Sequence, residues 1–232
     1  MLGTLLGDSV EMRRRKQLAA ASLKNLWRIW SNNKNNKIGI KKRIQLYNAY
    51  ITPILTYNAC TWALTETELQ ELEIFRRKQL RSIVGIRYPQ VISNAELYNK
   101  CGAVELQFAI RGARWRMLGH VLRMTKDTPA KHAMIYYFSN RKDGFTGRPR
   151  TTLPIIIDKD LKAMAKQTST HHNQNELDIP KQLTDLSDME KLETLANSRQ
   201  KWKSIVTNMQ VLELPKPKPK RLSMRTRENE QQ

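Results

Sequence analysis

The chain has 232 residues, of which 40% are hydrophobic, enough for one large domain or two small ones. Lysine and arginine number 41 against 21 aspartates and glutamates, a formal net charge of +20, and no run approaches the roughly 18 apolar residues of a membrane span. So large an excess of positive charge indicates a polyanionic partner, with nucleic acid as the first choice. An anionic membrane surface is a distant second, because the sequence has no lipidation motif and no basic amphipathic anchor.

The positive charge is concentrated in the first two thirds of the chain. Residues 1–125 carry a net charge of +13, residues 126–150 carry +4, residues 151–214 carry −1, and residues 215–232 carry +4. A surface that binds a polyanion is therefore expected mainly before residue 150.

Three residue pairs match the capping box that opens helices, in which Ser, Thr or Asp precedes Glu by three positions. They are Asp8 with Glu11, Thr65 with Glu68, and Ser93 with Glu96. Apolar residues recur at helical spacing after each pair, and no alternating strand pattern of useful length is present. An all-α fold is therefore predicted, with helices over residues 9–30, 40–54, 66–84, 94–100, 104–124, 130–138, 153–166 and 185–212.

Proline and glycine set the expected breaks. Pro53 predicts a kink or a new start in the second helix, with Thr52 as its cap, and Gly85 is the expected end of the third. Residues 167–175 are polar and are expected to be a loose connection. The run Pro215–Lys220 (PKPKPK) favours an extended backbone, so residues 215–232 are predicted to be a basic disordered tail. Lys216–Arg221 within it is interpreted as a nuclear import signal or a phosphate-contacting arm, and a disordered tail without either role is the alternative.

These features divide the chain into five expected regions. They are a helical domain over 1–88, a basic helical region over 89–143, a Gly/Arg/Pro connector over 144–150, a near-neutral helical segment over 151–214, and the tail over 215–232.

The residue types needed for metal or nucleophilic chemistry do not occur at useful spacings. Cys60 and Cys101 stand far apart without a CxxC pair, and the four histidines do not complete a zinc site. The two cysteines are interpreted as buried thiols in a reducing compartment. No Ser/His/Asp or Cys/His set can be assembled, so no catalytic residue, metal or other cofactor is predicted.

Clusters of basic residues are the candidate nucleic-acid contacts, because cationic side chains neutralise phosphates. In each cluster a solvated helix face is the alternative interpretation. The clusters are Arg13, Arg14, Arg15 and Lys16 near the first helix start; Arg76, Arg77 and Arg81, expected outside the inward stripe of helix 66–84; and Arg111, Arg114, Arg116 and Arg123 in helix 104–124.

Two further positions have competing interpretations. Gly147-Arg148-Pro149, followed by Arg150, matches the core of a minor-groove hook, although a flexible linker is the simpler interpretation. Trp115 lies on an apolar side of its helix beside Gly112 and Gly119, so we expect it to pack in the core rather than stack on a base.

Several stretches resemble the region after the catalytic palm in LINE-type (non-LTR) retrotransposon endonuclease–reverse transcriptases. The resemblance covers roughly residues 1–165 and 190–206, and its most specific piece is Arg114–Arg123 (RWRMLGHVLR). The other pieces are Leu2–Leu6 (LGTLL), Arg14–Lys16, Ile44–Tyr50 (IQLYNAY), Pro53–Tyr57 (PILTY) through Trp62, Phe75–Arg81 (FRRKQLR), Gly147–Arg150 (GRPR) and Ser198–Trp202 (SRQKW).

The resemblance implies a polymerase thumb over residues 9–85, followed by C-terminal helices that contact template RNA and DNA. It also implies that the palm, whose paired aspartates hold the catalytic metals, lies elsewhere, because this sequence has no Asp-Asp pair. The expectation is a non-catalytic nucleic-acid-binding fragment, nuclear or otherwise cytoplasmic rather than secreted, with the rest of a reverse transcriptase as a candidate partner. The alternatives are a host-adopted DNA-binding or adaptor protein and a scaffold whose charge only keeps it soluble.

Overall fold

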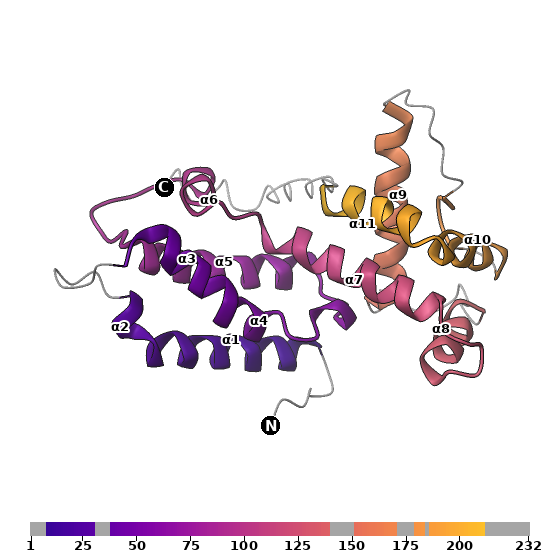
Figure 1. Cartoon of the computed structure of the whole chain (residues 1–232), viewed down its shortest axis with the longest axis horizontal. Coiled ribbons are helices and arrows are strands. Elements are labelled where there is room, and N and C mark those ends of the chain that lie inside the picture. Colours follow the sequence, from indigo (N-terminus) through magenta and orange to yellow (C-terminus); the bar gives the residue numbers. More distant parts are fainter. Residues whose placement is uncertain (1–7, 31–37, 140–150, 171–178, 184–185, 212–232) are drawn as a thin grey trace, which may run out of the picture.

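A computed structural model of the chain describes residues 8–30, 38–139, 151–170, 179–183 and 186–211. The described residues form helices and no strand, which confirms the all-α prediction (Figure 1). Arg148, Arg150 and the basic tail, to which the sequence assigned roles, lie outside the described residues. The helices are α1 (Asp8–Asn25), α2 (Trp27–Trp30), α3 (Ile40–Tyr50), α4 (Thr52–Leu55), the 3-10 turn η1 (Ala59–Thr61), α5 (Glu66–Val84), α6 (Asn94–Cys101), α7 (Leu106–Leu122), α8 (Pro129–Ser139), α9 (Leu153–Thr170), α10 (Leu186–Asn197) and α11 (Arg199–Val211).

Two of the three predicted capping boxes are present. Thr65 opens α5 and Ser93 opens α6, each accepting a hydrogen bond from the backbone N–H of the glutamate three residues later. Gly85 ends α5 with φ at 85°, a left-handed conformation that glycine adopts at no steric cost. The third predicted box has other bonds: Asp8 accepts from the backbone N–H of Ala63, and Glu11 pairs with Arg15.

The first hydrophobic core lies between α1 and the start of α7. Tyr47, Leu72 and Leu97, from α3, α5 and α6, are each fully buried in it. The side chains of Leu106 and Ile110, at the start of α7, belong to the same core.

A second core surrounds the remainder of α7. Trp115 and Leu118 pack there with Leu161 of α9 and with Trp202 and Ile205 of α11. Helix α7 therefore serves both cores, and Figure 1 shows it running from the α1–α6 group toward α8, α9 and α11. The two cores meet within α7, between Ile110 and Trp115.

Several helix boundaries differ from the predictions. The first expected helix is divided at Leu26, and the last is divided at Ser198 into α10 and α11. The break predicted within the second helix is present, but it falls at Ile51, which is the N-cap of α4. Pro53 therefore lies inside the first turn of α4, and Thr52 is not the cap. Proline is tolerated there because the first N–H groups of a helix have no intrahelical acceptor. Helix α9 continues to Thr170, beyond its predicted end.

Candidate nucleic-acid interface

The predicted binding residues differ widely in exposure. Arg13 and Arg116 are exposed, whereas Arg14, Lys16, Arg77, Arg81 and Arg123 are half-buried. Arg15, Arg76, Arg111 and Arg114 are buried, which corrects the expectation that they belong to a solvent-facing surface. The sequence predicted these positions from charge, and charge alone does not distinguish a phosphate contact from a buried ion pair.

Arg15 illustrates the buried class. It is 1% exposed, its Nε donates to Glu11 over 2.6 Å, and its guanidinium lies 4.3 Å from the centre of the Tyr57 ring. A carboxylate and an aromatic face together satisfy a cation that burial would otherwise penalise. Arg15 therefore joins α1 to the turn before η1.

Arg76 and Glu73 hold the connection between α6 and α7. Arg76 donates to the carbonyl of Val104, while Glu73 accepts from the backbone N–H of Leu106 and from the hydroxyl of Tyr98. Burial, followed by these contacts with Glu73, raises the pKa of Tyr98 well above its usual value. The Arg76 side chain therefore lies on the inward side of α5, where its guanidinium binds the carbonyl of Val104.

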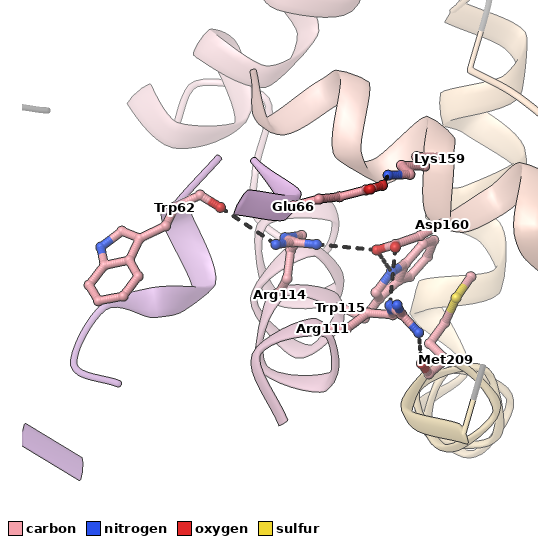
Figure 2. Close-up of polar contacts among 8 residues, drawn as sticks. All are labelled: Trp62, Glu66, Arg111, Arg114, Trp115, Lys159, Asp160 and Met209. Carbon is pink, nitrogen blue, oxygen red and sulfur yellow. Dashed lines mark hydrogen bonds and ion pairs between the residues drawn. The ribbon is translucent and has the colours of Figure 1, made fainter. Parts of the chain in front are cut away.

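Asp160 of α9 is the centre of a buried polar cluster (Figure 2). Its carboxylate contacts Arg111 at 3.1 Å and Arg114 at 3.3 Å, and it accepts a 3.0 Å hydrogen bond from Nε1 of Trp115. Arg114 also lies 3.5 Å from the carbonyl of Trp62, and Arg111 donates to the carbonyl of Met209. The cluster therefore connects the first core, α9 and α11 through α7.

Burial acts on both guanidinium groups of this cluster. It lowers the pKa of Arg111 and of Arg114 from their ordinary value, and the charge of Asp160 opposes that shift. The Asp160 carboxylate contacts both buried guanidinium groups. A shift of α7 against α9 would therefore disturb both ion pairs at once. A second ion pair, between Lys159 of α9 and Glu66 of α5, lies nearby on the surface.

Helices α7 and α11 pack closely and antiparallel along two glycines. A Cβ atom at Gly119 would lie closer than 3.0 Å to the Trp202 ring, and one at Gly112 would equally overlap the Gln210 side chain. Since Gly112 faces Gln210 and Gly119 faces Trp202, the two helices run in opposite directions. Glycine at both positions lets the two backbones approach closely.

One edge of this helix pair is basic. Arg111 reaches Met209 on one side of the seam, and Gln210 covers Gly112 on the other. With about 3.6 residues per helical turn, four exposed side chains project on the Gln210 side, two from each helix at i and i+4 spacing. They are Arg116, His120, Arg199 and Lys203, and we refer to them as the basic edge.

No acidic residue lies within either helix of the pair. Both α7 and α11 lack Asp and Glu along their whole length. Asp160 of α9 contacts both buried arginines of α7. The side chains of the basic edge remain exposed to solvent. Arg123 flanks it and is tied to the α10 carbonyl of Ala196.

The half-buried predicted residues have protein partners. Arg14 lies 3.7 Å from Glu11, Lys16 lies 3.4 Å from Glu71, and Arg81 donates to the side chain of Asn94 over 2.7 Å. Arg77 lies close enough to Tyr98 for its charge to oppose the rise in the pKa of that hydroxyl. Arg13 is the exposed member of its cluster and lies on α1, which does not belong to the basic edge.

A mainly apolar groove of about 830 Å³ lies between the start of α1, the η1–α5 connection, and helices α7 to α9. Two of its carboxylates, Asp8 and Glu68, are engaged by Ala63 and Thr65. Within the described part of the chain, no group of three His, Cys, Asp or Glu is arranged to hold a metal, and no helix is long and apolar enough to cross a membrane.

Sequence reasoning missed several of the residues that define this region. His120, Arg199 and Lys203 were not among the candidates, although the absence of acidic residues from 199–211 was a visible signal. Asp160 was not among the candidates either, although a carboxylate in the apolar run Leu153–Met164 indicates a buried partner. Cys101 is buried as expected, whereas Cys60 is partly exposed; both are free thiols.

Comparisons with protein-family models, with curated proteins and with solved structures gave no significant match.

Proposed function

We propose that this chain binds nucleic acid through the basic edge of the α7–α11 pair, as a non-catalytic region of a LINE-type reverse transcriptase. The observation that carries the proposal is that Arg116, His120, Arg199 and Lys203 lie together on a pair of helices without a single carboxylate. A net charge of +20 adds a long-range attraction for polyanions.

The chemistry of the edge favours phosphate contacts over base readout. Arginine and lysine at i and i+4 spacing present charge along a helix, and phosphate contacts position a protein without carrying sequence information. The expected ligand is therefore RNA or DNA of any sequence, recognised by its backbone.

The link to reverse transcriptases rests on the resemblance in the sequence, above all on Arg114–Arg123. That stretch supplies the buried Arg114 and Trp115 as well as Arg116 and His120 of the basic edge. In this interpretation the helices α1 to α5 correspond to a thumb, the catalytic carboxylates belong to another polypeptide segment, and the protein acts in the nucleus.

Fluorescence anisotropy with labelled 20-nucleotide RNA and with a 20-base-pair DNA duplex tests the proposal. If about five phosphates of the duplex are neutralised, the logarithm of the binding constant should fall with the logarithm of salt at a slope of about −4 to −5. Two oligomers of unrelated sequence should bind equally within about threefold. An affinity that does not depend on salt contradicts the proposal.

A matched pair of triple variants locates the surface. The edge variant Arg116→Ala, Arg199→Ala, Lys203→Ala should bind more than tenfold more weakly than the parent and reduce the salt slope by about 3, one unit for each lost contact. The control variant Lys41→Ala, Lys162→Ala, Lys181→Ala removes the same charge from exposed positions elsewhere. Equal losses in the two variants would show that net charge, and not the basic edge, drives binding.

A further inference from the structure

The connection between α5 and α6 presents two apolar side chains to solvent. Tyr88 is 94% exposed and Val91 is 84% exposed, the highest values among the large hydrophobic residues that the structure describes. Water around an unpacked aromatic ring is unfavourable, so such a residue is a candidate contact for a partner. Neither residue belongs to the basic edge.

Hydrogen bonds fix the two ends of this connection. At its start, the backbone N–H of Ile86 donates to the carbonyl of Arg81, and the Ile86 side chain is buried. At its end, Arg81 donates to Asn94 over 2.7 Å and lies 3.5 Å from the carbonyl of Ile92. The exposure of Tyr88 is therefore set by the packed helices on both sides.

A turn holds the exposed residues between these ends. The backbone N–H of Gln90 donates to the carbonyl of Arg87 over 2.8 Å, which closes a tight turn with Tyr88 at its tip. The backbone that carries the ring is consequently ordered, so little backbone freedom is lost when a partner binds.

The charges around Tyr88 favour an anionic partner. Arg87 is its exposed neighbour in sequence, and Glu96 is the one acidic residue between positions 76 and 104, where its carboxylate caps α6. Three basic residues of the same span are exposed, namely Lys78, Arg87 and Lys100, whereas Arg76 is buried beside Glu73 and Arg81 is bound to Asn94.

We infer that Tyr88 is a stacking platform for an unpaired base of single-stranded nucleic acid, with Arg87 contacting the adjoining phosphate. An exposed ring beside cations is the arrangement that single-strand binding uses, because every base has an aromatic face. A duplex keeps its base faces stacked inside the helix, so the platform serves single-stranded segments. This inference rests on the proposed nucleic-acid binding and adds to it a preference for unpaired bases.

Binding of a labelled 12-nucleotide RNA and of the corresponding 12-base-pair duplex to the full chain tests the inference. Tyr88→Ala should weaken single-strand binding at least about fivefold, change duplex binding by less than twofold, and leave the melting temperature unchanged. Tyr88→Phe, which keeps the ring, should bind like the parent. Tyr136→Ala on α8, which removes a ring that is 63% exposed, is the control and should also bind like the parent.

An abasic oligomer isolates the stacking contact. Replacing the central bases of a DNA 12-mer by abasic sites should weaken binding by the parent, while Tyr88→Ala should cause no additional loss on that oligomer. Unchanged binding of the intact strand by Tyr88→Ala overturns the inference, as does an equal loss on the duplex. If Tyr88→Ala instead shifts the sedimentation coefficient of the protein alone, the ring is a contact between copies of the chain and the inference fails.

The two proposals fail in different ways. Loss of the duplex salt dependence contradicts the proposed function, whatever Tyr88 does. If the parent binds the duplex with the expected salt dependence and Tyr88→Ala does not change single-strand binding, only the stacking role is contradicted.

Discussion

The indole Nε1 of Trp202 donates a 3.0 Å hydrogen bond to the backbone carbonyl of Trp115, and the two rings lie 5.7 Å apart at a tilt of 38°. The indole Nε1 of Trp115 in turn donates to Asp160. Three helices are therefore joined through two tryptophans: α11 bonds to α7, and α7 bonds to α9. The basic edge lies on the solvent side of this junction, so its geometry depends on buried contacts.

Removing the Trp115 ring should separate stability from binding. Trp115 is fully buried, as the sequence predicted, so Trp115→Ala should lower the free energy of unfolding by about 3–5 kcal/mol in urea titrations. Arg116→Ala removes an exposed neighbour and should leave stability within about 0.5 kcal/mol while weakening nucleic-acid binding. A Trp115→Ala protein that melts like the parent would contradict the packing role.

The two seam glycines should respond differently to alanine. At Gly119 the new methyl group meets the Trp202 ring, which its hydrogen bond holds in place, so Gly119→Ala should cost about 1–3 kcal/mol of overpacking. At Gly112 it meets the flexible Gln210 side chain, which can move, and the better helix propensity of alanine offsets the change.

Urea unfolding of both seam variants measures this difference, with Gly39→Ala as a control because nothing lies within 4 Å of its added Cβ atom. Equal stability of the Gly119→Ala and Gly112→Ala proteins would show that the Trp202 ring does not constrain the seam.

Neutralising Asp160 should destabilise the chain more than any exposed carboxylate does. Asp160→Asn removes the buried carboxylate that both Arg111 and Arg114 contact, which should cost about 3–5 kcal/mol. Asp127→Asn changes an exposed aspartate and serves as the control. Thermal denaturation at neutral pH distinguishes them, and a melting temperature shared by Asp160→Asn and the parent would mean that the ionic cluster is not needed for folding.

The start of α5 should contribute an acid-sensitive part of the stability. Desolvation raises the pKa of Glu68, but hydrogen bonds from Ser9 and Thr65 outweigh it, so the pKa lies below its ordinary value of 4.5. Because the folded-state pKa is depressed, this contribution is complete above the unfolded-state pKa and is lost as pH falls through the folded-state pKa.

Urea titrations between pH 3 and pH 7 measure that contribution. Thr65→Ala should cost about 1 kcal/mol at pH 7 through the lost cap, and Glu68→Gln should show a smaller loss of stability than the parent on acidification. If the free energy of unfolding falls equally with decreasing pH in Glu68→Gln and in the parent, the acid-sensitive contribution does not come from Glu68.

The sequence alone determined the helices and several of their ends, because these depend on contacts between residues a few positions apart. The boxes at Thr65 and Ser93, the stop at Gly85, and the burial of Trp115 beside two glycines were all readable from spacing. The break at Ser198 was not readable, since the apolar stripe continues across it.

Only the tertiary structure decided which cations are available to a ligand. Arg114 and Arg116 are two residues apart in the same basic stretch, yet Arg114 is 4% exposed and bound to Asp160, which lies 46 positions away, while Arg116 faces solvent. The basic edge also requires α11, whose residues join those of α7 through packing between segments more than 80 positions apart. Charge is a property of the residue, but its accessibility depends on distant partners, and local sequence patterns do not encode them.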